Sequence, residues 1–269
     1  MYCTACKTSV MATIRMCPKC GNRTFGDMLN TTDASMKTTG SSTMATAAAS
    51  SLTLFRDPTQ ITKWLRYFLY ASIVIDVIAI FSGVLQYQLL SNFKLGVYSA
   101  GDFISAAAEA NDQRQKVIGL IQVGVSITTI ILFAMWIYRA NFNARSLGAQ
   151  NMKFTPGWSV GYYFIPFLNL WRPYQAMKEI WKTSKNPLSW QGEKRGAILP
   201  WWWSLFLIDG MFGKASFKAS MNAKEIHELI NSTGLMIASD IVSIPASIIA
   251  ILLVGKIYEM QMSHVQNRV

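Results

Sequence analysis

Residues 64–88 read WLRYFLYASIVIDVIAIFSGVLQYQ, an apolar run with one acid in its middle and aromatic side chains at both ends. About 20 consecutive apolar residues in a helix are enough to cross a hydrocarbon core of about 30 Å. Aromatic side chains prefer the two membrane interfaces, so their positions in this run suit a transmembrane helix. The stretch therefore predicts a membrane protein.

The composition of the whole chain agrees with that prediction. Hydrophobic residues make up 51% of the 269 residues and charged residues only 14%, against roughly 25% charged residues in a typical soluble domain. The formal net charge is +11. A basic protein can bind nucleic acid or an anionic membrane surface. Because most charges lie beside the apolar runs, we expect a bilayer with anionic headgroups as the partner, and not nucleic acid.

Further apolar runs define the fold class. Residues 117–138 and 236–257 predict two more spanning helices, and residues 199–217, with three tryptophans suited to an interfacial anchor, predict a fourth. Residues 158–170 are too short to span comfortably and contain Pro166, which favours a re-entrant or interfacial segment. We predict an all-α polytopic membrane protein with about four transmembrane helices plus a re-entrant or interfacial hairpin.

The distribution of charge predicts the orientation. Residues 139–198 contain nine Lys or Arg and two acids, whereas residues 89–116 contain three of each sign. Cytoplasmic loops carry an excess of Lys and Arg, so the first region should be cytoplasmic, together with both termini. If residues 158–170 crossed the membrane, half of the basic region would lie outside and the protein would have five spans.

Four cysteines form two C-x-x-C pairs separated by ten residues: Cys3, Cys6, Cys17 and Cys20. Two such pairs can hold one zinc ion in a tetrahedral site of four thiolates, which leaves no open position for a substrate. We therefore predict one structural Zn²⁺. Two disulfides are the alternative, but a cytoplasmic segment lies in a reducing compartment.

These features predict three regions along the chain. Residues 1–26 form a small zinc ribbon. Residues 27–57, rich in Ser, Thr, Ala and Met, form a flexible linker because they cannot bury a core. Residues 58–269 form the helical transmembrane domain.

Three acids lie within predicted spans: Asp76, Asp209 and Asp240. A charge at the bilayer centre costs roughly 2.5 to 3.5 kcal/mol on insertion scales, so such acids need a partner, a proton or water. They can form an ion or proton path, or they can hydrogen-bond between helices, for example to Ser72, Gln122, Thr128 or Ser243. An intramembrane hydrolase with Asp76 and Asp209 as an aspartyl dyad is a less favoured alternative.

Residues 172–185, RPYQAMKEIWKTSK, predict an amphipathic helix. Tyr174, Met177 and Trp181 recur at helical spacing, opposite a row of lysines. A helix of this kind is expected to lie on the inner membrane surface, with its basic side toward anionic headgroups. A solvated basic loop is the alternative.

The runs RANFNARSLG (139–148), TPGW (155–158) and PFLNLWRPYQAMKEIW (166–181) resemble the bacterial membrane-protein family named domain of unknown function 4328. The resemblance covers about residues 60–265, including the Trp-rich span. It implies a multi-pass protein of the bacterial inner membrane and assigns no activity or catalytic residues.

The residues of this signature can also be interpreted physically. Two prolines should break the helix and fix a bend, while polar and amphipathic groups gather at the same membrane face. Arg172 can bind a lipid phosphate, or it can hold the hairpin to Asn141, Asn143 or backbone carbonyls. The candidate hairpin and lipid-contact residues are Asn141, Asn143, Pro166, Asn169, Trp171, Arg172, Pro173 and Tyr174.

Two functions follow from the sequence. In the first, a non-enzymatic binding, scaffold or regulatory protein engages a protein partner, or a second copy of itself, through its zinc ribbon and basic inner face. In the second, a small ion or solute conduit uses Asp76, Asp209 and Asp240. The two differ in whether these acids converge on a water-accessible cavity or lie in separate helix contacts.

Overall fold

The computed structural model describes residues 2–3, 25–26, 54–97 and 102–267. Within the last of these ranges, side chains are described from residue 106 onward. All structural statements below refer to these residues.

The chain divides into two units, Met1–Thr46 and Ala47–Val269, which are described separately. In the first unit, strand β1 (Tyr2–Cys3) pairs antiparallel with strand β2 (Phe25–Gly26), and Cys3 lies opposite Phe25. The other three predicted zinc ligands, Cys6, Cys17 and Cys20, lie outside the described residues. The zinc ribbon therefore stays a prediction.

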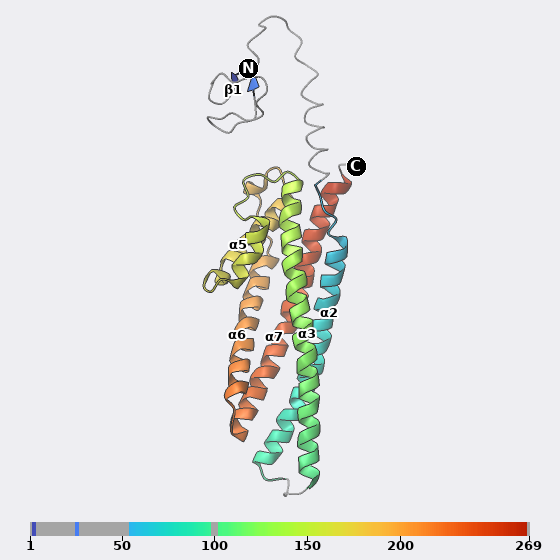
Figure 1. Cartoon of the computed structure of the whole chain (residues 1–269), viewed down its shortest axis with the longest axis vertical. Helices are drawn as coiled ribbons and strands as arrows, with labels where there is room; N and C mark the ends of the chain where they lie inside the picture. Colours follow the sequence, from blue (N-terminus) through green and yellow to red (C-terminus); the bar gives the residue numbers. More distant parts are fainter. Residues whose placement is uncertain (1, 4–24, 27–53, 98–101, 268–269) are drawn as a thin grey trace, which may run out of the picture. The chain divides into compact units, whose positions relative to one another are not determined.

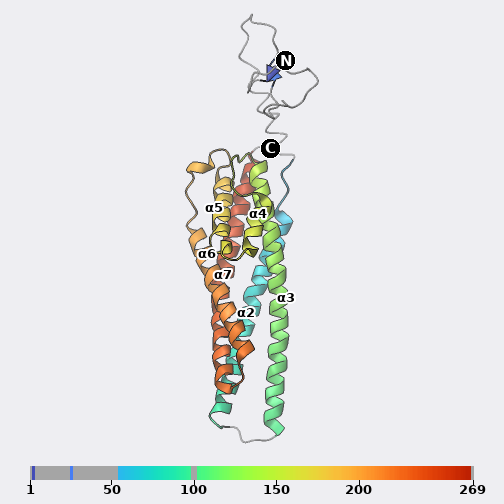
Figure 2. The same cartoon turned by 60° about the vertical axis from the view of Figure 1, so that its left-hand side comes forward.

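The second unit is built on four long helices (Figure 1). These are α2 (Thr59–Lys94), α3 (Asp102–Ser146), α6 (Ile198–Asn222) and α7 (Ile226–Gln266). Helix α2 packs against α3 and α7, and α7 packs against α6. The packing order is therefore α3–α2–α7–α6, with consecutive helices running in opposite directions (Figure 2).

Three of the predicted spans are confirmed as helices. Helices α2, α3 and α7 are long and apolar enough to cross a membrane. The fourth predicted span lies in α6, whose 25 residues extend about 37 Å at 1.5 Å per residue. That length suffices for a crossing, but α6 is not among the three described helices that are both long and apolar enough to be candidate spans.

The first and last long helices share one end of this unit. The hydroxyl of Thr59, at the start of α2, lies 3.1 Å from the hydroxyl of Tyr258 near the end of α7. The same end carries α5 (Arg172–Lys185), while the α2–α3 and α6–α7 connections lie at the opposite end (Figure 1). We call the end that carries α5 the α5 end.

Residues 158–170 form no spanning helix. They are divided among α4 (Pro156–Gly161), η1 (Tyr162–Phe164) and η2 (Leu168–Leu170), of which the longest has six residues. A proline disfavours helical backbone in the residue before it, and Ile165 is extended. Phe167, with φ of +66°, then completes the turn that reverses the chain. The segment is a hairpin, as the position of Pro166 predicted.

The hydrophobic core explains why α5 is a helix. Met177, Ile180 and Trp181 are 1%, 0% and 9% exposed because they pack among residues of the long helices, such as Leu65 and Ile257. A helix lying on the membrane surface would rest this apolar side on lipid, whereas the structure covers it with protein. Helical periodicity identifies an apolar face but does not identify what covers it.

Two of the three tryptophans at the start of α6, which were predicted to anchor the helix at the membrane interface, are also covered by protein. Trp202 and Trp203 are buried, and only Trp201, 68% exposed, is free to reach an interface. The Trp203 indole donates a 3.0 Å hydrogen bond to the carbonyl of Leu170. This bond ties the hairpin to α6.

Candidate functional site

Two of the three predicted membrane acids meet at one glutamine. The Gln122 amide of α3 donates to Asp240 Oδ1 of α7 at 3.1 Å and lies 3.5 Å from Asp76 Oδ1 of α2. These three side chains come from positions far apart in the sequence. They meet because α2 packs between α3 and α7.

The third acid lies on α6 and completes the group. Asp209 is within electrostatic range of both Asp76 and Asp240. The Ser243 side chain of α7 lies near Asp76. Ser243 and Asp209 both line a cavity that is described below. We call Asp76, Gln122, Asp209 and Asp240 the acid layer, since each long helix contributes one member.

The acid layer uses only some of the hydrogen-bonding partners that the sequence offered. Of the hydrogen-bonding partners expected for these acids, Gln122 takes that role and Ser243 lies beside Asp76. Ser72 and Thr128 instead donate to carbonyls of their own helices, those of Phe68 and Gly124. Asp76 and Asp240 thus share one interhelical hydrogen-bonding partner, whereas Asp209 lines the larger of two cavities and Asp240 the smaller one.

One carboxylate oxygen of Asp76 is buried without a hydrogen-bond partner among the described residues. The residue is only 7% exposed, and its Oδ2 atom has no hydrogen-bond partner among the described residues. A buried oxygen without a partner is costly unless a proton or a ligand satisfies it. The free Oδ2 atom of Asp76 can therefore accept a proton.

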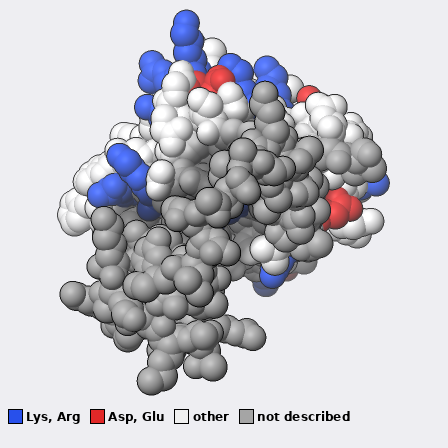
Figure 3. Space-filling view, turned by 90° about the horizontal axis from the view of Figure 1, so that it is seen from above, with Lys and Arg blue, Asp and Glu red and all other residues white. Residues whose placement is uncertain are grey.

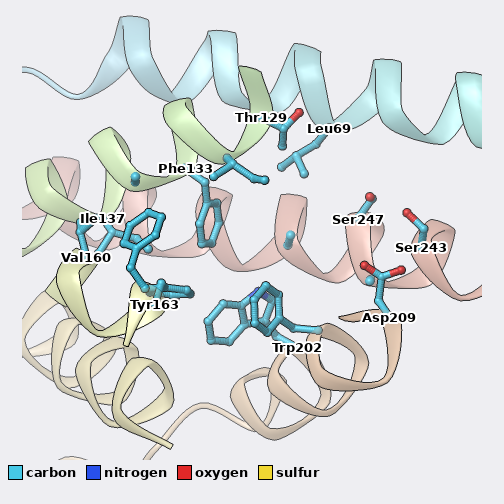
Figure 4. A pocket seen from close by; sticks show the side chains of 16 residues that line it. Leu69, Thr129, Phe133, Ile137, Val160, Tyr163, Trp202, Asp209, Ser243 and Ser247 are labelled. Carbon is cyan, nitrogen blue, oxygen red and sulfur yellow. The ribbon is translucent and has the colours of Figure 1, made fainter. Parts of the chain in front are cut away.

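A cavity of about 370 Å³ lies beside the acid layer, between α3 and α6 (Figure 4). Asp209 and Ser243 stand at one end of it, and Tyr163 and Val160 of the hairpin stand at the other. Its walls are mostly apolar and aromatic, with Phe133 of α3 and Trp202 of α6 facing its interior. The hydroxyl of Tyr163 is buried and has no hydrogen-bond partner among the described residues.

A much smaller cavity lies on the other side of the layer. It measures about 10 Å³, and its polar lining residues are Gln86, Gln115, Gln122, Thr233 and Asp240. A space of this size holds at most one water molecule. The described residues also contain no group of three or more His, Cys, Asp or Glu side chains placed to hold a metal ion.

Polar contacts continue from this small cavity toward the end opposite α5. Gln115 donates to the Ser82 carbonyl at 3.1 Å, and the Arg114 guanidinium donates to the Ser82 hydroxyl at 2.9 Å. Arg114 also donates to Asn111 Oδ1 at 2.7 Å. Polar side chains thus connect the acid layer with that end, whereas the side facing α5 is mostly apolar.

The family signature forms a hydrogen-bonded latch at the α5 end. Asn141, fully buried on α3, donates to the Phe154 carbonyl at 3.0 Å and to the Ser159 hydroxyl at 2.8 Å. Arg145 donates to the same carbonyl at 2.9 Å and to Asn141 Oδ1 at 3.2 Å. These bonds fasten the start of the hairpin to α3. We call this group the hairpin latch.

Glu179 of α5 completes the latch from the other side. Its two carboxylate oxygens accept the backbone N–H groups of Lys153 at 2.6 Å and Phe154 at 3.0 Å. Burial raises the pKa of Glu179 above its ordinary value of 4.5, although both N–H donors and the Arg145 guanidinium act in the opposite direction. Sequence reasoning missed both Arg145 and Glu179. The i, i+4 spacing of Asn141 and Arg145 was the available signal.

The other signature residues have different surroundings. Asn143, fully buried, binds the backbone of Arg56, accepting at 3.1 Å and donating at 2.8 Å. Arg172 bonds neither asparagine: it donates to Gln175 at 3.3 Å and lies over the Tyr162 ring. The remaining members are spread along the hairpin and the first turn of α5, with Pro166 and Trp171 exposed, Pro173 buried, and Asn169 and Tyr174 half-buried.

The α5 end carries a basic surface, and Lys and Arg side chains gather on its described part (Figure 3). Lys185 is paired with Glu193 at 2.7 Å, and this contact lowers the pKa of Glu193. The basic surface consists of exposed or half-exposed residues of α5 and its neighbouring loops: Lys153, Lys178, Lys182, Lys185, Lys194 and Arg195.

Comparison with known proteins identifies one family. Residues 102–259, more than half of the chain, match the family described as domain of unknown function (DUF4328). The match begins with α3 and ends within α7, so it leaves out α2, which the resemblance over residues 60–265 had included. No match was found among curated proteins or solved structures.

Proposed function

Since the chain belongs to the DUF4328 family, whose description assigns no activity, we propose from its site that the helical domain is a membrane conduit that binds and passes protons at Asp76, Asp209 and Asp240. The observation that carries this proposal is the acid layer, in which Gln122 joins Asp76 and Asp240 across three helices. Carboxyl groups are rare inside membranes and mark proton or ion pathways.

The size of the small cavity favours protons over hydrated ions. A space of about 10 Å³ beside Asp240 admits at most one water, so a cation with its hydration shell cannot enter. A proton needs only water and carboxyl groups in hydrogen-bonding distance, which one water beside Asp240 can supply, with Gln115 and Gln122 available to hold that water in place. Neighbouring carboxylates in an apolar interior repel each other, which favours sharing of protons among them.

The two sides of the acid layer have different roles in this proposal. The side facing away from α5 is polar through Ser82, Gln115 and Arg114. The side facing α5 is a mostly apolar cavity, in which the buried hydroxyl of Tyr163 has no hydrogen-bond partner among the described residues. Protons therefore reach the layer from the polar side and leave it only when water or a solute occupies the cavity.

Proton flux in proteoliposomes tests the proposal. Vesicles with a trapped pH-sensitive dye and an imposed potassium diffusion potential should acidify faster with the protein than without it. Asp76→Asn should reduce the excess rate by about tenfold or more, since an amide of the same shape cannot release a proton. Glu109→Gln removes a charge from an exposed position of α3 and should leave the rate unchanged. Equal rates for Asp76→Asn and the wild type would exclude the conduit.

The proposal requires no chemical reaction, in keeping with the expectation that the protein is not an enzyme.

The proposed conduit also has an orientation in the bacterial inner membrane, with the α5 end in the cytoplasm. Reporter tags at residues 1 and 269 should then give cytoplasmic signals, and a tag near Gly101 should give a periplasmic one. A periplasmic signal from residue 269 would contradict this orientation.

A second function is supported by the basic surface of the α5 end. In this proposal the surface and the predicted zinc ribbon hold a protein partner at the inner face of the membrane. The supporting observation is the group of lysines and arginine on α5 and its loops, of which only Lys185 is paired with an acid among the described residues.

Affinity purification from native membranes tests this second function. The full chain should retain the partner, and a variant without residues 1–26 should lose it. Lys178→Glu together with Lys194→Glu should also weaken retention if the basic surface contributes. A partner retained equally by all three proteins would show that neither feature is used.

A further inference from the structure

The 370 Å³ cavity is open to the side of the helical unit. Ile130 of α3 and Phe164 of the hairpin both line it, and they are 58% and 70% exposed. An enclosed cavity would have buried lining residues throughout. Because α3 and α6 are the outer members of the packing order, this opening faces the hydrocarbon interior when the helices span a bilayer. A ligand dissolved in the membrane can enter without passing through water.

The chemistry of the walls selects the charge of such a ligand. The lining residues are apolar, aromatic or hydroxyl-bearing, apart from one acid, Asp209, and none of those described is Lys, Arg or His. A half-buried carboxylate such as that of Asp209, without a basic neighbour, attracts a cation and repels an anion. Ser243 and Ser247, on the same side of the cavity as Asp209, can also donate to or accept from a polar group (Figure 4).

The aromatic walls suit the same kind of ligand. Phe133, Trp202 and Phe206 line the cavity together with Tyr163. Their ring centroids lie 6.0–6.2 Å apart in the pairs Phe133–Trp202, Trp202–Phe206 and Tyr163–Phe206, so they form one continuous wall. Aromatic faces attract organic cations and also pack against apolar groups.

The volume agrees with a small-molecule site. Pockets for small molecules measure roughly 300–1,000 Å³ and are mostly apolar with a few polar groups, as is this cavity of about 370 Å³. The free hydroxyl of Tyr163 offers a further polar contact at the end away from Asp209.

We propose that this cavity binds a lipophilic organic cation that enters from the bilayer, with its positive charge near Asp209 and its apolar groups against the aromatic wall. This inference deepens the proposed conduit function, because Asp209 belongs to the acid layer, and it identifies the solute that occupies the cavity. An uncharged lipid and an anionic lipid are the competing occupants.

Equilibrium binding to the full chain in nanodiscs of neutral lipid tests the proposal. The probe is tetraphenylphosphonium, and the comparison probe is tetraphenylborate, which has nearly the same size and the opposite charge. We expect saturable binding of the cation and none of the anion. Asp209→Asn should weaken cation binding by about tenfold or more, whereas Asp112→Asn should leave it unchanged.

Other outcomes would overturn the proposal. Equal binding of both probes would show an apolar cavity without charge selection, and tighter binding of the anion would point to an anionic lipid. Unchanged affinity in Asp209→Asn would show that the acid is not used. Ala246→Phe places a large side chain in the cavity and should abolish binding. If Ala246→Phe does not fold, the comparison of the two probes and the affinity of Asp209→Asn still decide the test. Proton flux is measured separately, so cation binding without flux would leave this inference standing while the conduit fails.

Discussion

The Asn141 amide donates a 2.8 Å hydrogen bond to the Ser159 hydroxyl, and both residues are completely buried. This bond joins α3 to the first helix of the hairpin. Since Asn141 also donates to the Phe154 carbonyl, one side chain satisfies two acceptors in the interior.

Replacing Asn141 by alanine should therefore destabilise the fold. We expect Asn141→Ala to lower the free energy of unfolding by about 1–3 kcal/mol, because buried acceptors lose their donor. Thermal unfolding in a mild detergent measures the effect. Gln113→Ala, at an exposed position of the same helix, is the control and should change little. Equal melting temperatures for the two variants would mean that the latch does not support the fold.

Glu179 should make stability depend on pH. Because burial raises its pKa in the folded state, folding favours the protonated form. Its stabilising contribution is complete below the ordinary value of 4.5 and is lost as the pH rises through the raised folded value. The melting temperature should fall across this range in the wild type.

Glu179→Gln should remove that part of the pH dependence. The amide cannot titrate, so the melting temperature of the variant should not change with pH through this range on account of position 179. Glu109→Gln, at an exposed site on α3, should retain the wild-type slope. An unchanged slope in Glu179→Gln would assign the titration to another group.

The tip of the hairpin should contact lipid. Phe164 and Phe167 are 70% and 77% exposed in the structure, so a bilayer around the hairpin would protect these positions from water. Cysteines introduced at positions 164 and 167 should resist a water-soluble thiol reagent, whereas cysteines at 153 and 185 should react from the cytoplasmic side. The parent protein provides the background from its own four cysteines.

The same labelling experiment has two contrary outcomes. Rapid reaction at 164 and 167 would place the hairpin in water. Labelling of any position between 172 and 198 only from the outside would mean that this region has crossed the membrane.

The N-terminal cysteines should bind one zinc ion per chain. Elemental analysis of the full protein should find a stoichiometry of about one, since four thiolates complete a tetrahedral site. Cys17→Ser should reduce zinc content and Ser42→Ala should not. Protein that contains no zinc when purified without chelators, or a content unaffected by Cys17→Ser, would contradict the site.

Much of the architecture was predictable because it depends on local properties of the sequence. The apolar runs around Asp76, in α3 and in α7 are long enough to show spanning helices without knowledge of their neighbours. Pro166 likewise marks the reversal of the hairpin, since proline restricts the backbone of the residue before it.

Contacts between distant residues were less predictable. The sequence indicated that Arg172 could hold the hairpin, but Arg145 performs that role, because the direction of each side chain depends on the rotation of α3 and α5. The sequence showed that α5 has an apolar side and that the start of α6 is rich in tryptophan. An apolar face of this kind can be covered either by lipid or by protein, and its amino-acid composition is the same in both cases. Only packing distinguishes the two.

The sequence by itself determined that this chain builds long apolar helices, carries acids within them and concentrates basic residues between residues 139 and 198. The tertiary structure alone decided that Asp76 and Asp240 share Gln122 and that Asp209 faces a cavity beside them. The physical reason is that hydrophobic length acts within one segment, whereas a shared hydrogen bond requires the order, direction and rotation of several helices together. Asp76 lies 46 positions before Gln122 in the sequence, and Asp240 lies 118 positions after it. The local sequence around each residue therefore does not reveal that the three side chains meet.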